Sequence, residues 1–298
     1  MTEFGLIKTL DVHSATRAYD RATEHLEKSL VINKEIGDRN EEAVCYDINY
    51  GYDKLGHAFH SISEYKKARE YVEKSLAIRK EIGDRNGEAF CYGNLGALCQ
   101  SVGKYGKARE FLEKSLVINK EIADRNREAL CYRKLGNVYF SVGEYEKARE
   151  HLKKSLVIKK EIGDTNGEAD CYLSFGATFQ AVGEYDKARE HIEKCLVMKK
   201  EMGDRDGEAG CYGNLGIVYR LVGEYDKARE HLEKSLVIRK EIGDRDGEAH
   251  CYVNLGTMYQ HFGQHDKARE NVEKSLEISK EIGDRNKEAH CYLNPSLR

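Results

Sequence analysis

The chain has almost no proline and no tryptophan, and it lacks an excess of charge of one sign. Its single proline, Pro295, stands near the end of the 298 residues, so little else interrupts helices. The 49 basic and 52 acidic residues leave a net charge of −3, which excludes a general attraction for nucleic acid. No apolar run approaches the roughly 18 residues that a membrane-spanning helix needs, and no secretory leader begins the chain. We therefore expect a soluble cytoplasmic protein, with no nucleic-acid or membrane partner.

Glycine, in contrast, is present 27 times and at regular intervals. The segment from Gly223 to Phe262 has near copies that begin at Gly103, Gly143 and Gly183, a spacing of 40 residues. A unit this short cannot bury its own apolar face, so the copies must stack on one another. The sequence predicts a single array, which we divide into a partial N-terminal repeat at 1–40, six complete repeats at 41–283 and a truncated helix at 284–298.

Each repeat contains two amphipathic helices. The one we call helix B has apolar residues at steps of mostly three and four, which is typical of one helix face. In the copy that begins at Tyr225 these residues are Tyr225, Ala228, Leu232, Leu236, Ile238 and Ile242. Gly243 is expected to end this helix in the left-handed conformation, and the polar run from Asp244 offers a cap for the next one.

The following helix, which we call helix A, has its own apolar stripe at Tyr252, Leu255 and Tyr259. Gly256 lies inside this helix although glycine there costs about 1 kcal/mol relative to alanine. Because this glycine recurs in every copy, we expect helix B to pass too close for a Cβ, with its alanine, here Ala268, as the opposing surface.

These residues resemble the tetratricopeptide repeat (TPR) signature. The matching positions are Tyr252, Leu255, Gly256, Tyr259, Gly263, Ala268, Val272 and Ser275. The period exceeds the usual length of about 34 residues and is similar to that of the Pins/LGN class of scaffolds and, less closely, of kinesin light chains. The resemblance implies an all-α, right-handed solenoid whose A helices line a concave groove that binds peptides or partner domains. The chaperone-binding clamp of the family is not reproduced.

The ends and the first repeat depart from this pattern. Residues 18–37 predict a lone helix B, and 287–294 begin a helix A that Pro295 stops. Cys45 lies ten residues before Leu55, six more than in later repeats. We therefore expect residues 45–51 to form a longer connection or an overhanging helix start, with Tyr52 at the signature position.

Cysteine is frequent but does not suggest a metal or disulfide framework. Six of the nine cysteines are one repeat apart: Cys91, Cys131, Cys171, Cys211, Cys251 and Cys291. Successive copies should be separated by a helix-packing distance of about 8 to 10 Å, too far for a disulfide or a shared zinc ion. We expect small buried side chains in a reducing compartment, and no metal or other cofactor.

Residues that differ between copies form a separate stripe along helix A. They recur at steps of three, four and three and mix apolar with polar types, whereas an idle solvent surface should drift toward polar residues. The resemblance places this stripe in the concave groove. As peptide-binding residues we select Asn94, Arg133, Lys134, Asn137, Phe140, Leu173, Gln180, Asn214, Ile217, Arg220, Leu221 and Asn254.

One repeat is basic. Residues 104–143 carry nine basic and five acidic side chains, and Arg127, Arg133 and Lys134 cluster there. The asparagines of the stripe add hydrogen-bond donors, so an acidic or extended peptide is a possible partner. A solvated charge run without a ligand is the alternative.

Three classes of function remain open. The first is a non-enzymatic scaffold for peptides or partner domains. The second is a structural solenoid that self-associates through its uncapped ends, as a homo-oligomer. The third, an enzyme, is disfavoured because no catalytic motif appears and because His25, His151, His191 and His231 are expected on the charged face of helix B.

Overall fold

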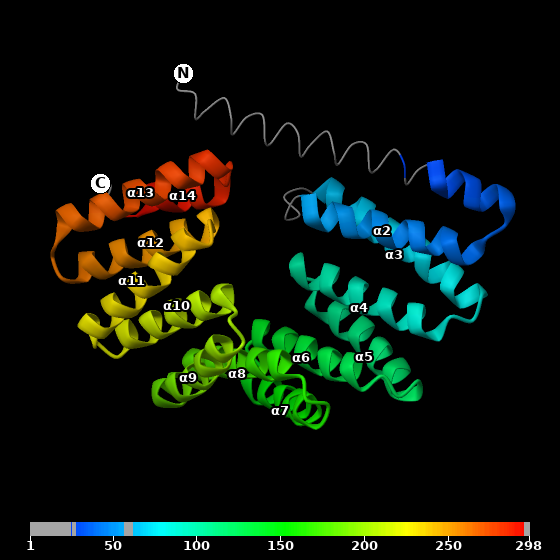
Figure 1. The fold of residues 1–298 in the computed structure, drawn as a ribbon, viewed down its shortest axis with the longest axis horizontal. Coiled ribbons are helices and arrows are strands. Elements are labelled where there is room, and N and C mark those ends of the chain that lie inside the picture. Colours follow the sequence, from blue (N-terminus) through cyan, green and yellow to red (C-terminus); the bar gives the residue numbers. More distant parts are fainter. Residues whose placement is uncertain (1–24, 26–27, 57–61, 295–298) are drawn as a thin grey trace, which may run out of the picture. The chain divides into compact units, whose positions relative to one another are not determined.

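The structure is a computed structural model that describes residue 25 and residues 28–56 and 62–294 (Figure 1). All regular structure in these ranges is helical. After helical residues 28–36 the helices are α2 (Arg39–Gly56), α3 (Ile62–Glu81), α4 (Arg85–Ser101), α5 (Tyr105–Glu121), α6 (Arg125–Ser141), α7 (Tyr145–Glu161), α8 (Thr165–Ala181), α9 (Tyr185–Glu201), α10 (Arg205–Leu221), α11 (Tyr225–Glu241), α12 (Arg245–His261), α13 (His265–Ile282) and α14 (Arg285–Leu293). Even-numbered helices are A helices and odd-numbered helices are B helices.

The chain divides into two compact units, residues 1–144 and 145–298, and we describe each by itself. Within each unit, helices that follow one another in the chain pack together, as α4 does with α5 and α10 with α11. This packing of consecutive helix pairs confirms the predicted all-α solenoid fold.

The loops between helices use the predicted residues. Gly243 adopts φ +72°, and the side chain of Asp244 accepts a hydrogen bond of 2.9 Å from the backbone N–H of Gly247. This arrangement ends α11 and starts α12, because it satisfies backbone groups at both helix ends. Ala123 takes the place of the glycine after α5 and is the one non-glycine residue with positive φ, +58°, among the described residues.

The glycine inside each A helix is required by a close approach. A Cβ on Gly216 would lie 2.7 Å from Leu232 Cγ and 3.2 Å from the carbonyl oxygen of Ala228. The expectation of a helix B that passes too close is therefore confirmed. The main obstacle is the leucine side chain, and the alanine contributes through its backbone.

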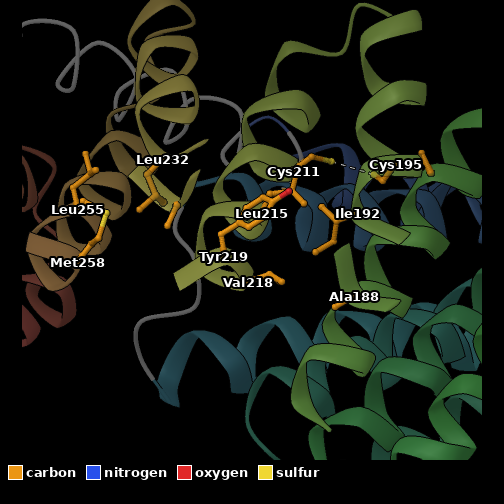
Figure 2. Packing of buried hydrophobic residues seen from close by; sticks show 12 residues of the cluster. Ala188, Ile192, Cys195, Cys211, Leu215, Val218, Tyr219, Leu232, Leu255 and Met258 are labelled. Atoms are coloured by element: carbon orange, nitrogen blue, oxygen red, sulfur yellow. Dashed lines mark hydrogen bonds between the residues drawn. The ribbon is translucent and has the colours of Figure 1, made fainter. Parts of the chain in front are cut away.

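A continuous core runs through the second unit from α8 to α12 (Figure 2). Ile192 of α9 and Leu215 of α10 are each 1% exposed, and Met258 of α12 is fully buried. The apolar face predicted for α11 is buried at Ala228, Leu232 and Ile238, but Ile242 lies beyond the helix end and is 40% exposed. The prediction that Ile242 belongs to this buried face is wrong, and the equivalent Ile282 of α13 is exposed to the same extent.

Lysine side chains cover the signature tyrosines on the outside of the core. The ring of Tyr212 lies between Lys200 and Lys234, whose Nζ atoms are 5.0 and 5.7 Å from its centroid. Lys240 and Lys274 flank Tyr252 in the same way. These cation–π contacts link the tyrosine of each A helix to the B helices before and after it.

The first repeat differs from its prediction. Residues 45–51 are helical and belong to α2, so the longer connection that we expected there is not present. Tyr46, 4% exposed and flanked by Lys34 and Lys74, occupies the signature position that we assigned to Tyr52. The helix start is in register because Ala43 and Tyr46 pack against Ile78. The extra residues therefore follow residue 47. Of the helix predicted at 18–37, residues 28–36 are helical, and residues 18–27 lie outside the described residues apart from the helical residue 25.

Candidate functional site

The predicted binding residues all lie on A helices. Asn94 is on α4, Leu173 and Gln180 are on α8, and Asn254 is on α12. The remaining eight are Arg133, Lys134, Asn137 and Phe140 on α6 and Asn214, Ile217, Arg220 and Leu221 on α10. Ten of the twelve are half-buried, whereas Asn94 is buried and Leu221 is exposed.

On α10 the stripe and the signature residues separate clearly. Leu215 and Tyr219 are buried, at 1% and 7% exposure, while Ile217 and Arg220 are half-buried. This alternation follows from helix geometry, because residues three or four apart share a face. Solvent therefore reaches the stripe, while the buried signature residues hold the helix in the core.

Within each unit, successive A helices contact one another. α4 contacts α6 in the first unit, and α10 contacts α12 in the second. The structure therefore brings Asn94 onto a helix adjacent to that of Arg133 and Lys134, and Ile217 onto a helix adjacent to that of Asn254. The stripes of these neighbours therefore lie on helices that adjoin each other from one repeat to the next.

Arg127, which the sequence groups with Arg133 and Lys134, has a structural role. Its guanidinium hydrogen-bonds to the side chain of Asn86 on α4 and lies 5.7 Å from the centroid of the Phe90 ring. Its Nε also lies 3.7 Å from a carboxylate oxygen of Asp124, the N-cap of α6. Arg127 therefore joins two successive A helices, which sequence reasoning missed.

The same role recurs at the other junctions between a helix B and the next helix A from α3 onward. We call junction cation the basic side chain that pairs with the N-cap aspartate there. The junction cations are Arg79, Arg127, Lys159, Lys199, Arg239 and Lys287. Lys199 shows the pattern: its Nζ lies 2.8 Å from Asp204 and 2.6 Å from Asn166 Oδ1 on the preceding helix A. Lys199, together with the N–H of Gly207, lowers the pKa of Asp204.

The junction cation comes from either of two helices. Where helix B supplies it, as with Lys199, a glycine follows on helix A, and a Cβ on Gly207 would lie 2.6 Å from Lys199 Cδ. Where helix A supplies it, as with Arg127, helix B carries a small or neutral residue, the buried Asn119. This exchange was visible in the sequence and was the signal that identifies these residues.

A hollow of about 310 Å³ lies beside the first junction cation. Its lining residues are Asp47, Arg79, Asp84, Asn86, Gly87, Phe90 and Arg127, from the A helices α2, α4 and α6, from the end of α3 and from the cap of α4. Arg79 pairs with Asp84 at 2.6 Å and Asp47 at 3.0 Å, yet its buried Nε meets no acceptor among the described residues. An unsatisfied guanidinium N–H suits a carboxylate or carbonyl oxygen from outside.

Asn94 is a second donor without an acceptor. It is 9% exposed, and its Nδ2 finds no hydrogen-bond partner among the described residues. The equivalent Asn214 donates to the carbonyl oxygen of Gly210 at 2.8 Å. Asn94 and Asn214 therefore differ, because the buried Nδ2 of Asn94 is left without an acceptor.

Two of the four histidines expected on the charged face of helix B, His191 and His231, pack against aromatic rings, whereas His25 is exposed. His231 packs against Tyr212 and Tyr219, with ring centroids 5.7 and 5.0 Å apart, and His191 packs against Phe175 and Phe179. Desolvation is the main cause that lowers the pKa of His231. These rings fill space between the two helices of a repeat.

The described part of the chain offers neither a metal-binding cluster nor a membrane-spanning helix. No cluster of three or more His, Cys, Asp or Glu side chains there could hold a metal ion. No helix in the same residues is long and apolar enough to cross a membrane.

Comparison with known families decides the classification. A family model described as tetratricopeptide repeat matches residues 47–121, 127–201 and 208–294, which is more than half of the chain. The chain belongs to the tetratricopeptide repeat family. A comparison with curated protein sequences gave no match.

This TPR chain is also similar to solved structures. One is BtubC (BKLC) from P. vanneervenii, 18% identical over 90% of this chain and 93% of that one, with a TM-score of 0.56. A putative kinesin light chain with nearly identical TPR-like repeats from Podosopora anserina is 19% identical over 65% and 95%, with a TM-score of 0.53. A Rap protein complexed with Competence and Sporulation Factor is 14% identical over 90% and 80%, with a TM-score of 0.64. At these identities the likeness extends to the fold alone.

Proposed function

We propose that this TPR protein is a non-enzymatic scaffold that binds peptide segments or partner domains along the stripe of its A helices. The observation that carries the proposal is that Leu173 of α8 and Ile217 of α10 in the second unit, and Phe140 of α6 in the first, are half-buried on helices whose signature residues are buried. Apolar side chains that stay accessible on the stripe of an A helix, between polar ones, suit an extended ligand.

The partner that fits best is acidic. Arg133 and Lys134 lie on the stripe of α6, and the hollow beside Arg79 offers the Nε donor described above. Asn94 adds an amide donor on the neighbouring helix α4. A carboxylate at the hollow and backbone carbonyls along the stripe would use these donors together.

Two further observations support a scaffold. A Rap protein with the same fold was solved in complex with Competence and Sporulation Factor, a precedent for ligand binding by this architecture. The period of 40 residues resembles that of the Pins/LGN class of scaffolds. The proposal includes a cytoplasmic location, since nine buried cysteines outside any disulfide are compatible with a reducing compartment.

Affinity measurement with selected peptides tests this function. Peptides from a displayed library are selected on the full chain, and their binding is measured by fluorescence polarisation. We expect selected peptides to be rich in Asp and Glu, and Lys134→Glu with Phe140→Ala to weaken binding at least about tenfold, or about 1.4 kcal/mol. The control Lys107→Glu makes the same charge change on an exposed site of α5 and should leave affinity unchanged. Equal affinities for both variants would refute the groove.

Self-association is a second candidate, favoured by α14. Tyr292 is 53% exposed and Leu293 67%, whereas the equivalent Tyr252 is 8% exposed because Ile278 and Leu236 pack near it. A second copy could cover this face. Light scattering over a concentration series measures it: a mass that rises with concentration and falls back with Tyr292→Lys supports this function, and a constant monomer mass rejects it.

A further inference from the structure

A serine of helix B touches a cysteine of the next helix A at every described junction from α3 onward except one. The oxygen-to-sulfur distances fall between 3.3 and 3.5 Å for the pairs Ser75–Cys91, Ser115–Cys131, Ser155–Cys171, Ser235–Cys251 and Ser275–Cys291. At the junction of α9 with α10 the serine is replaced by Cys195. Its sulfur lies 3.2 Å from that of Cys211.

These two thiols form the one pair of cysteines in hydrogen-bond contact among the described residues (Figure 2). Both side chains are fully buried, and they come from helices that pack directly on each other. A disulfide bond of about 2.05 Å requires the sulfurs to approach by only about 1 Å more. The equivalent serine–cysteine pairs show that the backbone holds two small side chains face to face at this position in each repeat.

The surroundings make Cys195 the more acidic thiol of the pair. The hydrogen bond from Cys211 and the nearby Lys199 ammonium lower the pKa of Cys195 against the effect of burial, and the pKa of Cys211 is raised. At the serine-paired junction of α3 with α4, burial raises the pKa of Cys91 to about 12, so that thiol stays protonated. Cys195 therefore differs from its neighbours in chemistry as well as in identity.

We propose that Cys195 and Cys211 are a redox modification site that closes to an intramolecular disulfide when a hydroperoxide is supplied. The Cys195 thiolate attacks a peroxide oxygen, the O–O bond breaks and hydroxide leaves, which gives a sulfenic acid on Cys195. The Cys211 sulfur then attacks the Cys195 sulfur, the S–O bond breaks and, with the Cys211 proton, water leaves. Two thiols are oxidised by two electrons, and one peroxide is reduced to water.

The bond would join α9 to α10, the last helix of one repeat and the first of the next. It would fix the packing of these two helices, and α10 carries the stripe residues Ile217 and Arg220. A dithiol reductant reverses it by exchange. The site is independent of the proposed peptide groove, since neither sulfur lies on the exposed stripe.

Peptide mapping of the full chain tests the site. The reduced protein is treated with a small excess of hydrogen peroxide, denatured, alkylated, digested and analysed by mass spectrometry. We expect a linked peptide pair that contains Cys195 and Cys211, with alkylation of the other seven of nine cysteines. We also expect the thermal midpoint of the oxidised protein to rise and to return after reduction.

Two variants serve as matched controls. Cys195→Ser restores the residue of the other repeats, so it should fold, lose the link and show no midpoint change with peroxide. Ser235→Cys creates a second thiol pair with Cys251, 3.3 Å away in the native repeat, and should add a second linked peptide. The proposal is overturned if the wild type keeps both thiols alkylatable, or if Cys195 accumulates as a sulfinic acid, under peroxide that fully oxidises added glutathione.

Discussion

Two junctions place a cation beside the cap aspartate but take it from different helices. Helix B supplies it at the junction between α11 and α12, and helix A supplies it at the junction between α13 and α14. At the first, Arg239 of α11 lies 2.6 Å from the cap Asp244 and also pairs with Asp206 on α10. At the second, Ser279 of α13 is fully buried, and Lys287 of α14 lies 2.9 Å from the cap Asp284 and pairs with Asp246 on α12.

The difference shows what each junction requires. In both cases one cation lies beside the cap aspartate. The equivalent position on the other helix of the junction carries a small residue, which leaves room for that cation. A buried or half-buried carboxylate needs such a partner, because an unpaired charge in that place is costly. The residue on helix B or the residue on helix A does not reveal this requirement by itself, because the cation comes from either helix. Comparing both positions at each junction does reveal it.

The strongest way to break this comparison is to place both cations at one junction. In Gly247→Lys the new Cβ would lie 2.5 Å from Arg239 Cδ, and two cations would compete for the same carboxylates. We expect a loss of about 3 kcal/mol in the free energy of unfolding, measured by urea denaturation. Gly106→Lys is the control, since a Cβ there meets nothing within 4 Å. An equal loss in both variants would contradict the argument.

The exchange itself is tested by moving the cation. Arg239→Ser combined with Gly247→Lys reproduces the arrangement of Ser279 and Lys287. The free energy of unfolding of the double variant should therefore lie within about 1 kcal/mol of that of the wild type. A double-mutant cycle then measures a favourable coupling of about 2 kcal/mol between the two changes. Strict additivity of the single variants would mean that the two positions do not share one space.

Gly216 provides a sharper comparison, because no exchange of residues between the two helices makes room for a Cβ at this glycine. Gly216→Ala should cost about 2 kcal/mol, since Leu232 and the Ala228 carbonyl already occupy the space for a Cβ. Gly213→Ala, three residues earlier, should instead gain about 1 kcal/mol, because its Cβ would make an ordinary contact of 3.5 Å with Ser235 Oγ. Melting curves of both variants measure the pair, and the same sign for both would refute the explanation.

The features that could be predicted from the sequence are those that repeat with a fixed spacing. The helix pairs, the left-handed Gly243, the cap Asp244 and the close approach at Gly216 all follow from periodic residues and elementary backbone chemistry. Register was the weak point: Tyr46 and not Tyr52 is the signature residue, because the position of extra residues within a helix is invisible in spacing alone.

The candidate site could be predicted only in part. The stripe on the A helices follows from comparison of the copies, but the role of Arg127 does not, since its partner Asn86 lies 41 residues away on another helix. The contact of Cys195 with Cys211 was missed for a related reason. Spacing by one repeat directs attention to equivalent positions, whereas this contact joins two different positions of adjacent helices.

The smallest expected effect concerns a bridge that one repeat lacks. Arg205 at the start of α10 lies 2.6 Å from Glu208 and also pairs with Glu241 at the end of α11, but Thr165 stands at the equivalent position of α8. Because Glu168 and Glu201 occupy the matching acidic positions, Thr165→Arg should complete the bridge.

We expect Thr165→Arg to gain about 0.5 kcal/mol at low salt, because the partners at such a site are largely exposed. The gain should vanish in about 1 M salt, where screening is strong. Thr165→Lys is the control, since it has the charge without the fork that binds two carboxylates at once. A gain that persists at high salt, or that lysine reproduces in full, would assign the effect to helix propensity. The arginine bridge would then be a surface ion pair that the fold can omit, and it would differ in this respect from the junction cation.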